Sequence, residues 1–504
     1  MVVGGLAPLA GLAQAFSIAW PATGQPLWWL QLASLALFCA ALNATATVRQ
    51  AFFAGWLFAV AWLAGTFWWL FISMHTYGGL AAPLAALAVL ALAAFLGAYY
   101  ATAAAVFRWL APRGLMAGAA AFAALWLLAE LLRAEWFTGF PWGAGGYAHV
   151  DGPLAFLAPW TGAYGIGLIA AAAAFALSRL HEMRRSRGYW AGLVGAALLL
   201  AACAQVDARH GDAAGEPLSV TLLQGNIPQD EKFESGSGVP LALDWYGQQL
   251  QASRSSLTVA PETAIPLLPQ QLPEGYLQAL AARFGQGGQA ALVGIPLGSF
   301  EQGYTNSVVG LKPGADAYRY DKHHLVPFGE FIPPLFRWFT DLMNIPLGDF
   351  NRGAVGQPSF EWQGQRLAPN VCYEDLFGDE LAARFADPAR APTVFVNVSN
   401  IGWFGNTIAI DQHLHISRMR ALEFARPVIR ATNTGATAII DHRGRVTHAL
   451  ERFSRGVLTG EVQGREGVTP YAQWAARLGL WPLWLLGLAP AFAAMVRLRR
   501  RAAT

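Results

Sequence analysis

Residues 367–375 read Leu-Ala-Pro-Asn-Val-Cys-Tyr-Glu-Asp and end an apolar run at the thiol of Cys372. An apolar run that stops at reactive side chains is typical of a buried strand followed by a turn. A strand-to-helix turn exposes a nucleophile and directs backbone N–H groups at a developing oxyanion. We therefore interpret Cys372 as a nucleophile. A buried structural cysteine is the alternative, but the neighbouring Tyr373 and Glu374 favour the first interpretation.

Strands alternate with helices on both sides of Cys372, from about residue 217 to 466, where the composition is that of a globular domain. This alternation predicts a layered α/β or α+β domain. The predicted strands cover residues 218–223, 257–260, 290–295, 367–372, 393–398, 428–432 and 437–440, and the predicted helices cover about 241–254, 273–284, 376–386 and 409–425.

Two further strand ends carry reactive side chains. Glu262 follows the strand at 257–260, and Lys322 opens the stretch 322–356, which is rich in Pro, Gly and Phe. A positioned carboxylate can take a proton from a nucleophile, and a positioned ammonium can stabilise an oxyanion. Glu330 either holds Lys322 in place or serves as a second acid or base. Taken alone, Glu262 or Lys322 could equally be a solvated side chain at the end of a strand. The hypothesis of an active site therefore depends on both residues occurring together with Cys372.

Neither a metal site nor a nucleic-acid site is predicted. The cysteines Cys39, Cys203 and Cys372 have no metal-binding or disulfide spacing. His323 and His324 are adjacent, but no further ligand pattern accompanies them. The net charge of +3 is small, and the basic residues cluster beside apolar segments, which excludes a nucleic-acid signature. We expect no cofactor.

The rest of the chain is depleted in charge. Of the 504 residues, 55% are hydrophobic and 13% charged, whereas a soluble protein has roughly 25% charged residues. No acidic residue precedes Glu130, and the first charged side chain is Arg49. A helix of about 20 apolar residues spans a bilayer. Seven such runs precede the domain and an eighth follows it, near residues 4–20, 27–46, 50–73, 80–107, 115–133, 154–178, 189–205 and 476–496.

Arginines determine the predicted orientation, because cytoplasmic loops carry an excess of Lys and Arg. The loops after the second, fourth and sixth runs and the C-terminal tail hold most of them, and the first and third loops hold none. Both termini are therefore predicted to be cytoplasmic, and the globular domain extracytoplasmic. The predicted domains are a seven-helix transmembrane domain at 1–208, an extracytoplasmic catalytic domain at 217–466, an eighth transmembrane helix at 476–496 and a basic cytoplasmic tail at 497–504.

In this order and local context, Glu262, Lys322 and Cys372 resemble the Glu–Lys–Cys triad of the nitrilase (carbon–nitrogen hydrolase) superfamily. That resemblance implies an αββα sandwich. The whole chain, including residues 67–79 and 130–142, resembles the apolipoprotein N-acyltransferase family, in which such a domain lies between a seventh and an eighth span. The expected fold is thus about eight transmembrane helices plus a nitrilase-like sandwich.

The resemblance implies a general base at Glu262, a nucleophile at Cys372 and an oxyanion stabiliser at Lys322. It further implies that an acyl chain passes from a phospholipid, phosphatidylethanolamine, through a thioester on Cys372 to the α-amino group of a diacylglyceryl-cysteine. The acceptor is an apolipoprotein, and the compartment is the inner membrane with a periplasmic catalytic domain. The supporting positions that match the family are Glu330, Tyr373, Glu374 and Phe233, the last of which is Trp in some members.

Three alternatives remain at this point. A membrane-tethered nitrilase-type amidase would share the triad but use water to hydrolyse a small amide. A transporter with a regulatory domain would require charged residues in several spans or broken helices, and the apolar runs are largely charge-free. A scaffold with an inactive enzyme domain is disfavoured, because all three triad positions hold chemically competent residues.

Overall fold

The computed structural model describes residues 2–180, 211–332 and 350–502, together with Trp190, Gly192, Gly195 and Leu198. The chain divides into two compact units. The helical unit comprises Met1–Trp68, Pro83–Ala208 and Leu478–Thr504, and the sandwich unit comprises Trp69–Ala82 and Arg209–Arg477. Apart from the four positions above, the predicted seventh span lies outside the described residues, and so does the stretch 333–349 of the predicted long loop. The predicted domain boundaries stay predictions.

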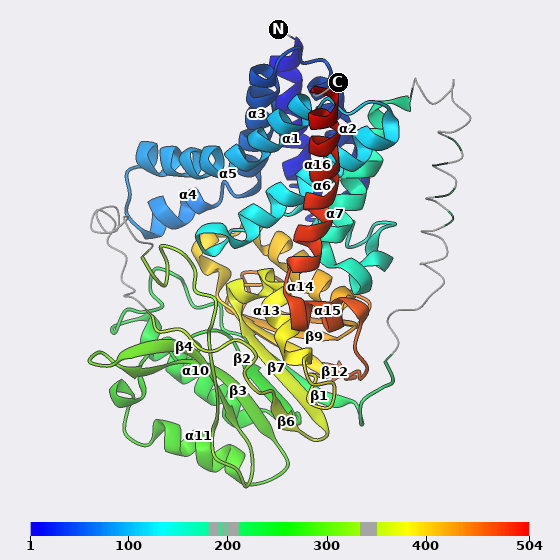
Figure 1. Ribbon diagram of the computed structural model, residues 1–504. Helices are drawn as coiled ribbons and strands as arrows, with labels where there is room; N and C mark the ends of the chain where they lie inside the picture. Colours follow the sequence, from blue (N-terminus) through cyan, green and yellow to red (C-terminus); the bar gives the residue numbers. More distant parts are fainter. Residues whose placement is uncertain are drawn as a thin grey trace. The chain divides into compact units, whose positions relative to one another are not determined.

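Apolar helices make up the helical unit (Figure 1). Within the described ranges, four of them are long and apolar enough to cross a membrane. These four are α3 (Val48–Thr66), α5 (Ala82–Leu110), α6 (Leu115–Glu135) and α7 (Ala158–Ser178), accompanied by α1 (Val2–Ile18), α2 (Trp28–Asn43) and α16 (Trp481–Ala502). The helical nature of the apolar region is confirmed, and the number of eight spans stays a prediction.

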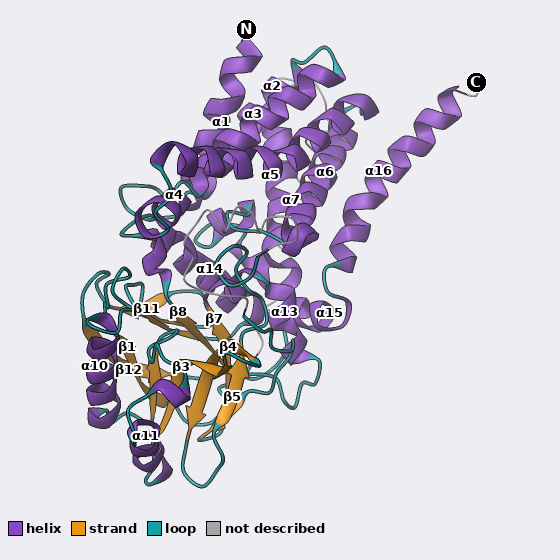
Figure 2. Cartoon of the chain, turned by 90° about the vertical axis from the view of Figure 1, so that its left-hand side faces the viewer, coloured by secondary structure: helices purple, strands orange, loops and turns teal. Residues whose placement is uncertain are grey.

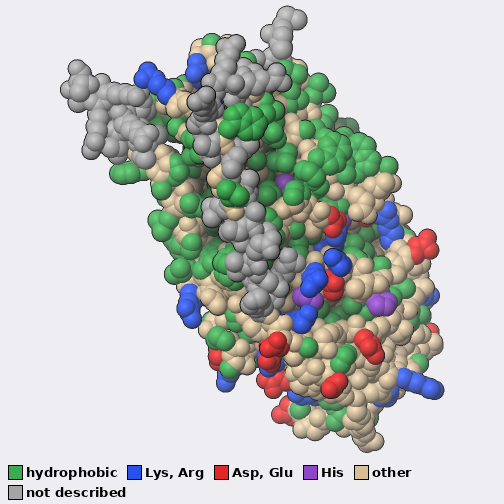
Figure 3. Space-filling model, turned by 90° about the vertical axis from the view of Figure 1, so that its right-hand side faces the viewer, with side chains coloured by type: hydrophobic (Ala, Val, Ile, Leu, Met, Phe, Trp, Pro, Cys, Tyr) green, Lys and Arg blue, Asp and Glu red, His purple; other side chains and the backbone are tan. Residues whose placement is uncertain are grey.

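Large apolar side chains point outward from these helices. Leu87 is 61% exposed and Met116 66% exposed. On the face that Figure 3 shows, hydrophobic side chains gather over the helices, and charged side chains over the sandwich unit. Extended apolar surface of this kind marks a site of contact with lipid or protein, and helices satisfy their own backbone hydrogen bonds as lipid requires.

Two six-stranded sheets form the sandwich unit (Figure 2). The first has the order β12-β1-β2-β3-β4-β5, and the second β11-β10-β9-β8-β7-β6. The strands are β1 (Leu218–Gln224), β2 (Leu257–Ala260), β3 (Ala290–Ser299), β4 (Gly303–Leu311), β5 (Tyr318–Asp321), β6 (Phe360–Trp362), β7 (Gln365–Val371), β8 (Val394–Ser399), β9 (Val428–Thr432), β10 (Ala438–Ile440), β11 (Val446–Ala449) and β12 (Gly456–Val462).

The two faces of each sheet bury different cores, because successive side chains of a strand point to opposite faces. In β3, Ala290 and Leu292 pack in the core shared by the two sheets. Ala291 and Val293 pack instead against helices α10 (Gly238–Ala252) and α11 (Tyr276–Gly285). The second sheet is covered in the same way by α13 (Gly378–Ala382), α14 (Ala409–Phe424) and α15 (Pro470–Leu478). The predicted two-sheet α/β domain is therefore confirmed.

All seven predicted strands are present, as β1, β2, β3 and β7 to β10. Two others were predicted without bounds: β11 as the strand after a hairpin turn at residues 441–444, and β5 as the strand that ends before Lys322. Strands β4, β6 and β12 were not predicted. Strand β11 is exposed along its whole length, so no apolar pattern marks its bounds in the sequence. Strand β4 carries Thr305, Asn306 and Ser307 in its middle, where polar side chains interrupt the alternation although all three are buried.

Parallel strands place the site. Strands β1, β2 and β3 are parallel to one another, as are β7, β8 and β9. Ligands bind beyond the carboxyl ends of parallel strands in open α/β sheets. Glu262 follows β2, Cys372 follows β7 and Asn400 follows β8, so these three residues leave the sheets at this edge.

The connection between α3 and α5 belongs to the sandwich unit. It contains α4 (Leu70–Ile72) and a π-helical turn over Ser73–Tyr77. The Trp69 indole N–H donates to Gln412 Oε1 at 3.1 Å, and its ring lies 4.2 Å from the ring of Phe404. Gln412 lies on α14 next to His413, so these contacts reach the helix that packs behind Cys372.

Candidate active site

A tight turn presents the Cys372 side chain. Strand β7 ends at Val371, and a 3₁₀ turn over Cys372–Leu376 follows at once. Cys372 has φ of +51°, a left-handed conformation that costs a non-glycine residue of order 1–3 kcal/mol. The thiol-bearing residue is partly exposed, whereas Val371 and Glu374 are buried. The predicted change from strand to helical turn at the cysteine is confirmed.

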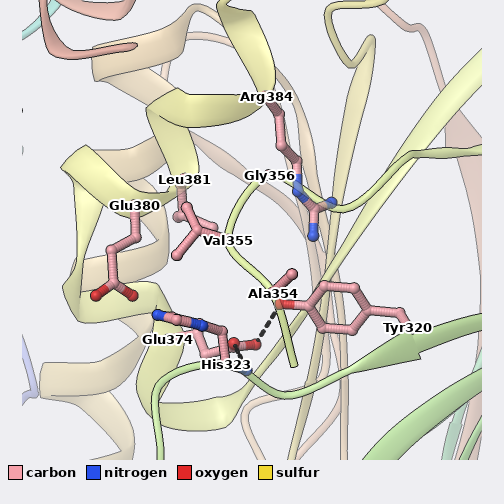
Figure 4. A pocket seen from close by; sticks show the side chains of 9 residues that line it. All are labelled: Tyr320, His323, Ala354, Val355, Gly356, Glu374, Glu380, Leu381 and Arg384. Atoms are coloured by element: carbon pink, nitrogen blue, oxygen red, sulfur yellow. Dashed lines mark hydrogen bonds between the residues drawn. The ribbon is translucent and has the colours of Figure 1, made fainter. Parts of the chain in front are cut away.

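The carboxylate of Glu374 fastens this turn. One oxygen accepts from the backbone N–H of Val371 at 2.6 Å and from the Tyr320 hydroxyl at 2.8 Å. The other accepts from the backbone N–H groups of His323 at 2.7 Å and His324 at 3.3 Å. Figure 4 shows Glu374 between Tyr320 and His323 in the wall of a small pocket. A buried carboxylate thus ties the cysteine turn to the segment that follows β5.

His413 holds the other side of the turn. Its Nε2 lies 3.2 Å from the Cys372 carbonyl oxygen, and its Nδ1 lies 2.9 Å from Arg430 Nη2. An arginine only donates, so Nδ1 is the acceptor and Nε2–H donates to the carbonyl. Burial, reinforced by the Arg430 charge, places the pKa of His413 well below its usual range. His413 is therefore a neutral donor with one tautomer.

Lys322 occupies the centre of a buried charge cluster. Its ammonium lies 2.8 and 2.9 Å from the two oxygens of Glu330 and 3.5 Å from Glu262 Oε1. The Asn306 amide donates to both glutamates, at 2.7 Å to Glu262 and 2.8 Å to Glu330. Glu262 is completed by the backbone N–H of Asn400, which donates to Oε2 at 2.7 Å. Two carboxylates and one ammonium therefore meet with their positions fixed by amide donors.

The protonation states follow from this cluster. Burial lowers the pKa of Lys322, but Glu330 and Glu262 raise it more strongly, so the net pKa lies above its ordinary value and the ammonium persists. Burial raises the pKa of the Cys372 thiol to about 12; Glu262 and Glu330 add to the rise, and Lys322 opposes it. At neutral pH the resting cysteine is a thiol. Its activation therefore requires a base, and Glu262 is the carboxylate that interacts with it most strongly.

Lys232 and Phe233 lie on the loop after β1, and this loop contacts the main chain of Glu262. The Lys232 ammonium donates to the Glu262 carbonyl oxygen at 3.0 Å and lies 5.8 Å from the Phe233 ring centre. Tyr373 is buried next to Cys372, and its ring packs against Phe377 with centroids 5.3 Å apart. The structure thus brings all seven predicted site residues to the carboxyl edge of the sheets.

The adjacent histidines are engaged separately. His323 Nδ1 lies 2.7 Å from the Gly353 carbonyl oxygen, and His324 Nδ1 lies 2.9 Å from Glu380 Oε1. His324 also stacks on Phe377 with ring centroids 3.5 Å apart. Across the described part of the chain, no group of three or more His, Cys, Asp or Glu residues is arranged to hold a metal ion.

Sequence reasoning missed several residues of this site. Asn306 went unnoticed because its strand was not predicted. Arg430 lies inside an apolar strand that was predicted, and a lone arginine there is a signal that could have been used. His413 lies in a predicted helix, where a histidine is usually a packed residue; it is fully buried, and it also contacts the Cys372 carbonyl. Lys232 lies between Glu231 and Phe233, and nothing in this local sequence indicates that its side chain is buried.

Comparisons with known proteins cover both units. Residues 10–176 match the family model for the apolipoprotein N-acyltransferase N-terminal domain, and residues 219–471 match the carbon-nitrogen hydrolase model. Apolipoprotein N-acyltransferase of Verminephrobacter eiseniae is 62% identical, over 94% of this chain and 92% of that protein. Apolipoprotein N-acyltransferase of Ralstonia nicotianae is 45% identical, over 94% and 90% respectively.

Two solved structures are similar to about half of this chain. An amidase of the nitrilase superfamily from Nesterenkonia is 16% identical, covers 54% of this chain and 98% of its own, and has a TM-score of 0.40. A carbon–nitrogen hydrolase superfamily protein from Xanthomonas campestris is 22% identical, covers 53% and 96%, and has a TM-score of 0.37.

Proposed function

Because this chain belongs to the apolipoprotein N-acyltransferase family, we propose that it acylates apolipoproteins. A phospholipid gives up an acyl chain, and the α-amino group of an N-terminal diacylglyceryl-cysteine receives it, which is the last step of bacterial lipoprotein maturation. The observation that carries this proposal is the thiol of Cys372, set on a turn beside the Glu262–Lys322–Glu330 cluster. A tethered amidase is less well supported, because the family match extends over the helical unit.

In the first half-reaction, Glu262 takes the Sγ proton of Cys372 and the thiolate attacks the ester carbonyl carbon of the phospholipid. The tetrahedral intermediate collapses as the C–O bond breaks. Glu262 returns its proton to the leaving oxygen, so a neutral lysophospholipid departs and a thioester remains on Cys372. Dividing one difficult step into two easier ones is the advantage of covalent catalysis.

Lys322 stabilises the oxyanion. Its pKa lies above the ordinary value, so the ammonium stays charged when negative charge develops on the carbonyl oxygen. Both oxygens of Glu330 contact this ammonium, within 2.9 Å, and prevent it from turning away. A fixed donor of this kind stabilises the transition state without reorganisation during the reaction.

In the second half-reaction, the acceptor nitrogen attacks the thioester carbon. Glu262 takes a proton from that nitrogen and gives it to the departing sulfur as the C–S bond breaks. The product carries a third acyl chain in amide linkage, and the thiol is restored. Phospholipid and apolipoprotein are thus used in turn, which makes the mechanism ping-pong.

The remaining predicted residues support this chemistry. We assign to Glu374 the fixing of the nucleophile turn, through the four hydrogen bonds that it accepts. Tyr373 supports the same turn from its buried position beside Phe377. Phe233 provides an aromatic surface for a lipid chain near Glu262. Each of these three roles is second to those of Glu262, Lys322 and Cys372.

The proposed location is the bacterial inner membrane, with eight spans and the catalytic domain on the periplasmic side. The support is the distribution of arginine, which is concentrated in alternate loops and in the C-terminal tail. We propose phosphatidylethanolamine as the acyl donor, as the family resemblance implies. No cofactor takes part in the scheme.

Replacing Cys372 by alanine tests the proposal. In vesicles that contain phosphatidylethanolamine and no acceptor, the wild-type protein should gain the mass of one acyl chain and release one equivalent of lysophospholipid. C372A should do neither, and N-acylation of a diacylglyceryl peptide should fall to background. C39A is the matched control, since it removes a buried thiol from α2; it should retain both reactions. Acylation by C372A would refute the proposal.

A further inference from the structure

The second half-reaction poses a proton problem. An α-amino group has a pKa of about 8, so at neutral pH most of the acceptor is an ammonium without a lone pair. It must lose one proton before it attacks the thioester and another when the amide forms. Glu262 transfers the second of these protons from the nitrogen to the sulfur. A second acceptor near Glu262 would take the first proton inside the active site and increase the neutral fraction of the bound acceptor.

Lys232 lies next to Glu262. Its side chain is 1% exposed, and its ammonium nitrogen lies 3.0 Å from the main-chain oxygen of Glu262. In the described part of the chain, no ion pair includes Lys232, whereas Lys322 contacts two carboxylates. A buried lysine that is not paired with an anion favours its neutral form.

The loop that carries Lys232 is fixed relative to Glu262. Asn400 donates through its side-chain amide to Gln229 Oε1 at 2.8 Å and through its backbone N–H to Glu262 Oε2 at 2.7 Å. The Asn433 amide reaches both Asn400, at 3.2 Å, and the Ile227 carbonyl, at 2.9 Å. Residues 227 to 232 and Glu262 thus belong to one hydrogen-bonded assembly.

The charges around Lys232 agree with this geometry. Burial lowers the pKa of Lys232 to about 7, and the neighbouring Glu262 and Cys372 oppose that fall. When Cys372 carries the acyl chain as a thioester, it has no charge, so it does not hold Lys232 in its protonated form. A neutral amine is therefore available on Lys232 near neutral pH at the stage when the acceptor arrives.

We propose that Lys232 is the base that deprotonates the ammonium of the acceptor in the second half-reaction. This inference rests on the proposed function. The Lys232 amine takes one proton from the acceptor ammonium, and the freed nitrogen attacks the thioester carbon. Glu262 moves the second proton from nitrogen to sulfur. One acceptor and one thioester yield one amide, one thiol and a protonated Lys232, which then releases its proton to water.

Two acceptor nucleophiles, one protonated and one neutral at pH 7, can distinguish whether Lys232 acts as a base or only supports the structure. The acyl-enzyme is formed first from phosphatidylethanolamine vesicles and then mixed either with a diacylglyceryl peptide or with hydroxylamine, which is already neutral at pH 7. For K232M, each transfer rate is compared with the rate at which the same variant forms the acyl-enzyme. Transfer to the peptide at pH 7 should slow about 100-fold, the lower range for general base catalysis. Transfer to hydroxylamine should be unchanged.

K232R provides the conservative control. Arginine keeps a donor for the Glu262 carbonyl but stays protonated, so K232R should show the same selective loss as K232M. For both variants, transfer to the peptide should recover as the pH rises above about 8, where the acceptor deprotonates by itself. Acyl-enzyme formation in the same sample shows that each variant is folded.

Three outcomes overturn the inference: equal slowing with both nucleophiles, restoration by K232R, or wild-type transfer to the peptide by K232M. The first two assign Lys232 a positioning role at Glu262, and the third assigns it none. If K232M does not form the acyl-enzyme, K232R alone decides between these outcomes. Failure of the proposed function is distinguishable, because the wild-type protein itself would then form no acyl-enzyme.

Discussion

Lys322 and Lys232 contact the same residue and have opposite surroundings. Each is 1% exposed, and each reaches Glu262, Lys322 at the carboxylate and Lys232 at the main-chain carbonyl. Two glutamates raise the pKa of Lys322 above its ordinary value, whereas burial lowers that of Lys232 to about 7. Burial alone does not determine the charge of a lysine; the charge of its partners does. One active site can therefore hold a permanent cation and a titratable amine.

The largest effect is expected when the permanent cation is removed. K322M takes away the oxyanion stabiliser and leaves Glu262 and Glu330 facing each other, both bound by Asn306. Removal of the ammonium leaves these two buried carboxylates without their common counter-ion, which also disturbs Glu262. Acyl-enzyme formation should fall at least about 10³-fold, as measured by lysophospholipid release. K232M should slow this step far less than K322M, and an equal loss in both variants would contradict the difference proposed between the two lysines.

E330Q should produce a smaller decrease in the rate of acyl-enzyme formation. It leaves Lys322 with fewer anionic partners and so makes its surroundings more like those of Lys232. It removes one of two anions and loosens the contacts of 2.8 and 2.9 Å that position the ammonium. Acyl-enzyme formation should slow about 100-fold, the loss that a displacement of about 1 Å produces.

The same variant should make the Cys372 thiol more reactive toward iodoacetamide at neutral pH. Glu330 is one of the negative groups that raise the thiol pKa, so its neutralisation lowers that pKa and increases the thiolate fraction. The alkylation rate and the acylation rate should thus move in opposite directions. A parallel decrease in both rates would indicate general damage to the site and contradict this account.

The residues at the strand ends were predictable from the sequence, but many of their partners were not. Glu262 and Cys372 each follow a continuous apolar run, and such a run predicts both a buried strand and the place where it ends. The residues that set their chemistry are harder to find. Asn306 binds both glutamates from β4, whose buried polar residues hide the strand pattern. The Arg430–His413 pair is formed by residues 17 positions apart, and its relation to Cys372 depends on the packing of α14 against the second sheet.

The sequence also does not reveal that the charged side chain of Lys232 is buried. A lysine between Glu231 and Phe233 reads as a solvated loop residue, and its burial follows from how the loop folds over Glu262. The helical unit presents the converse case: apolar runs predict helices well, but the number of spans depends on helix length and on residues outside the described ranges. The local sequence pattern therefore predicts helices and strands, whereas the partners of a buried charged side chain are determined by the tertiary structure.

The smallest expected effect concerns the pH dependence of stability, to which Lys232 should contribute and Lys322 should not. An unfolded lysine binds its proton up to a pH of about 10.4, whereas buried Lys232 loses it near pH 7. Between these values the unfolded state binds one more proton, so the contribution of Lys232 to the unfolding free energy rises with pH, by at most about 1.4 kcal/mol per pH unit. Lys322 is protonated in both states over this window and contributes no slope.

The measurement is the Tm of the purified protein in detergent at pH 7, 8 and 9, compared between wild type and K232M. The difference between the two cancels the titration of all other groups. The wild type should gain Tm relative to K232M as the pH rises, while K322M should be destabilised by several kcal/mol, as expected for a broken buried ion pair, without a change of slope. A wild-type minus K232M difference that stays constant from pH 7 to 9 would mean that Lys232 is charged when folded. The two lysines would then be electrostatically alike, and Lys232 could not serve as a base.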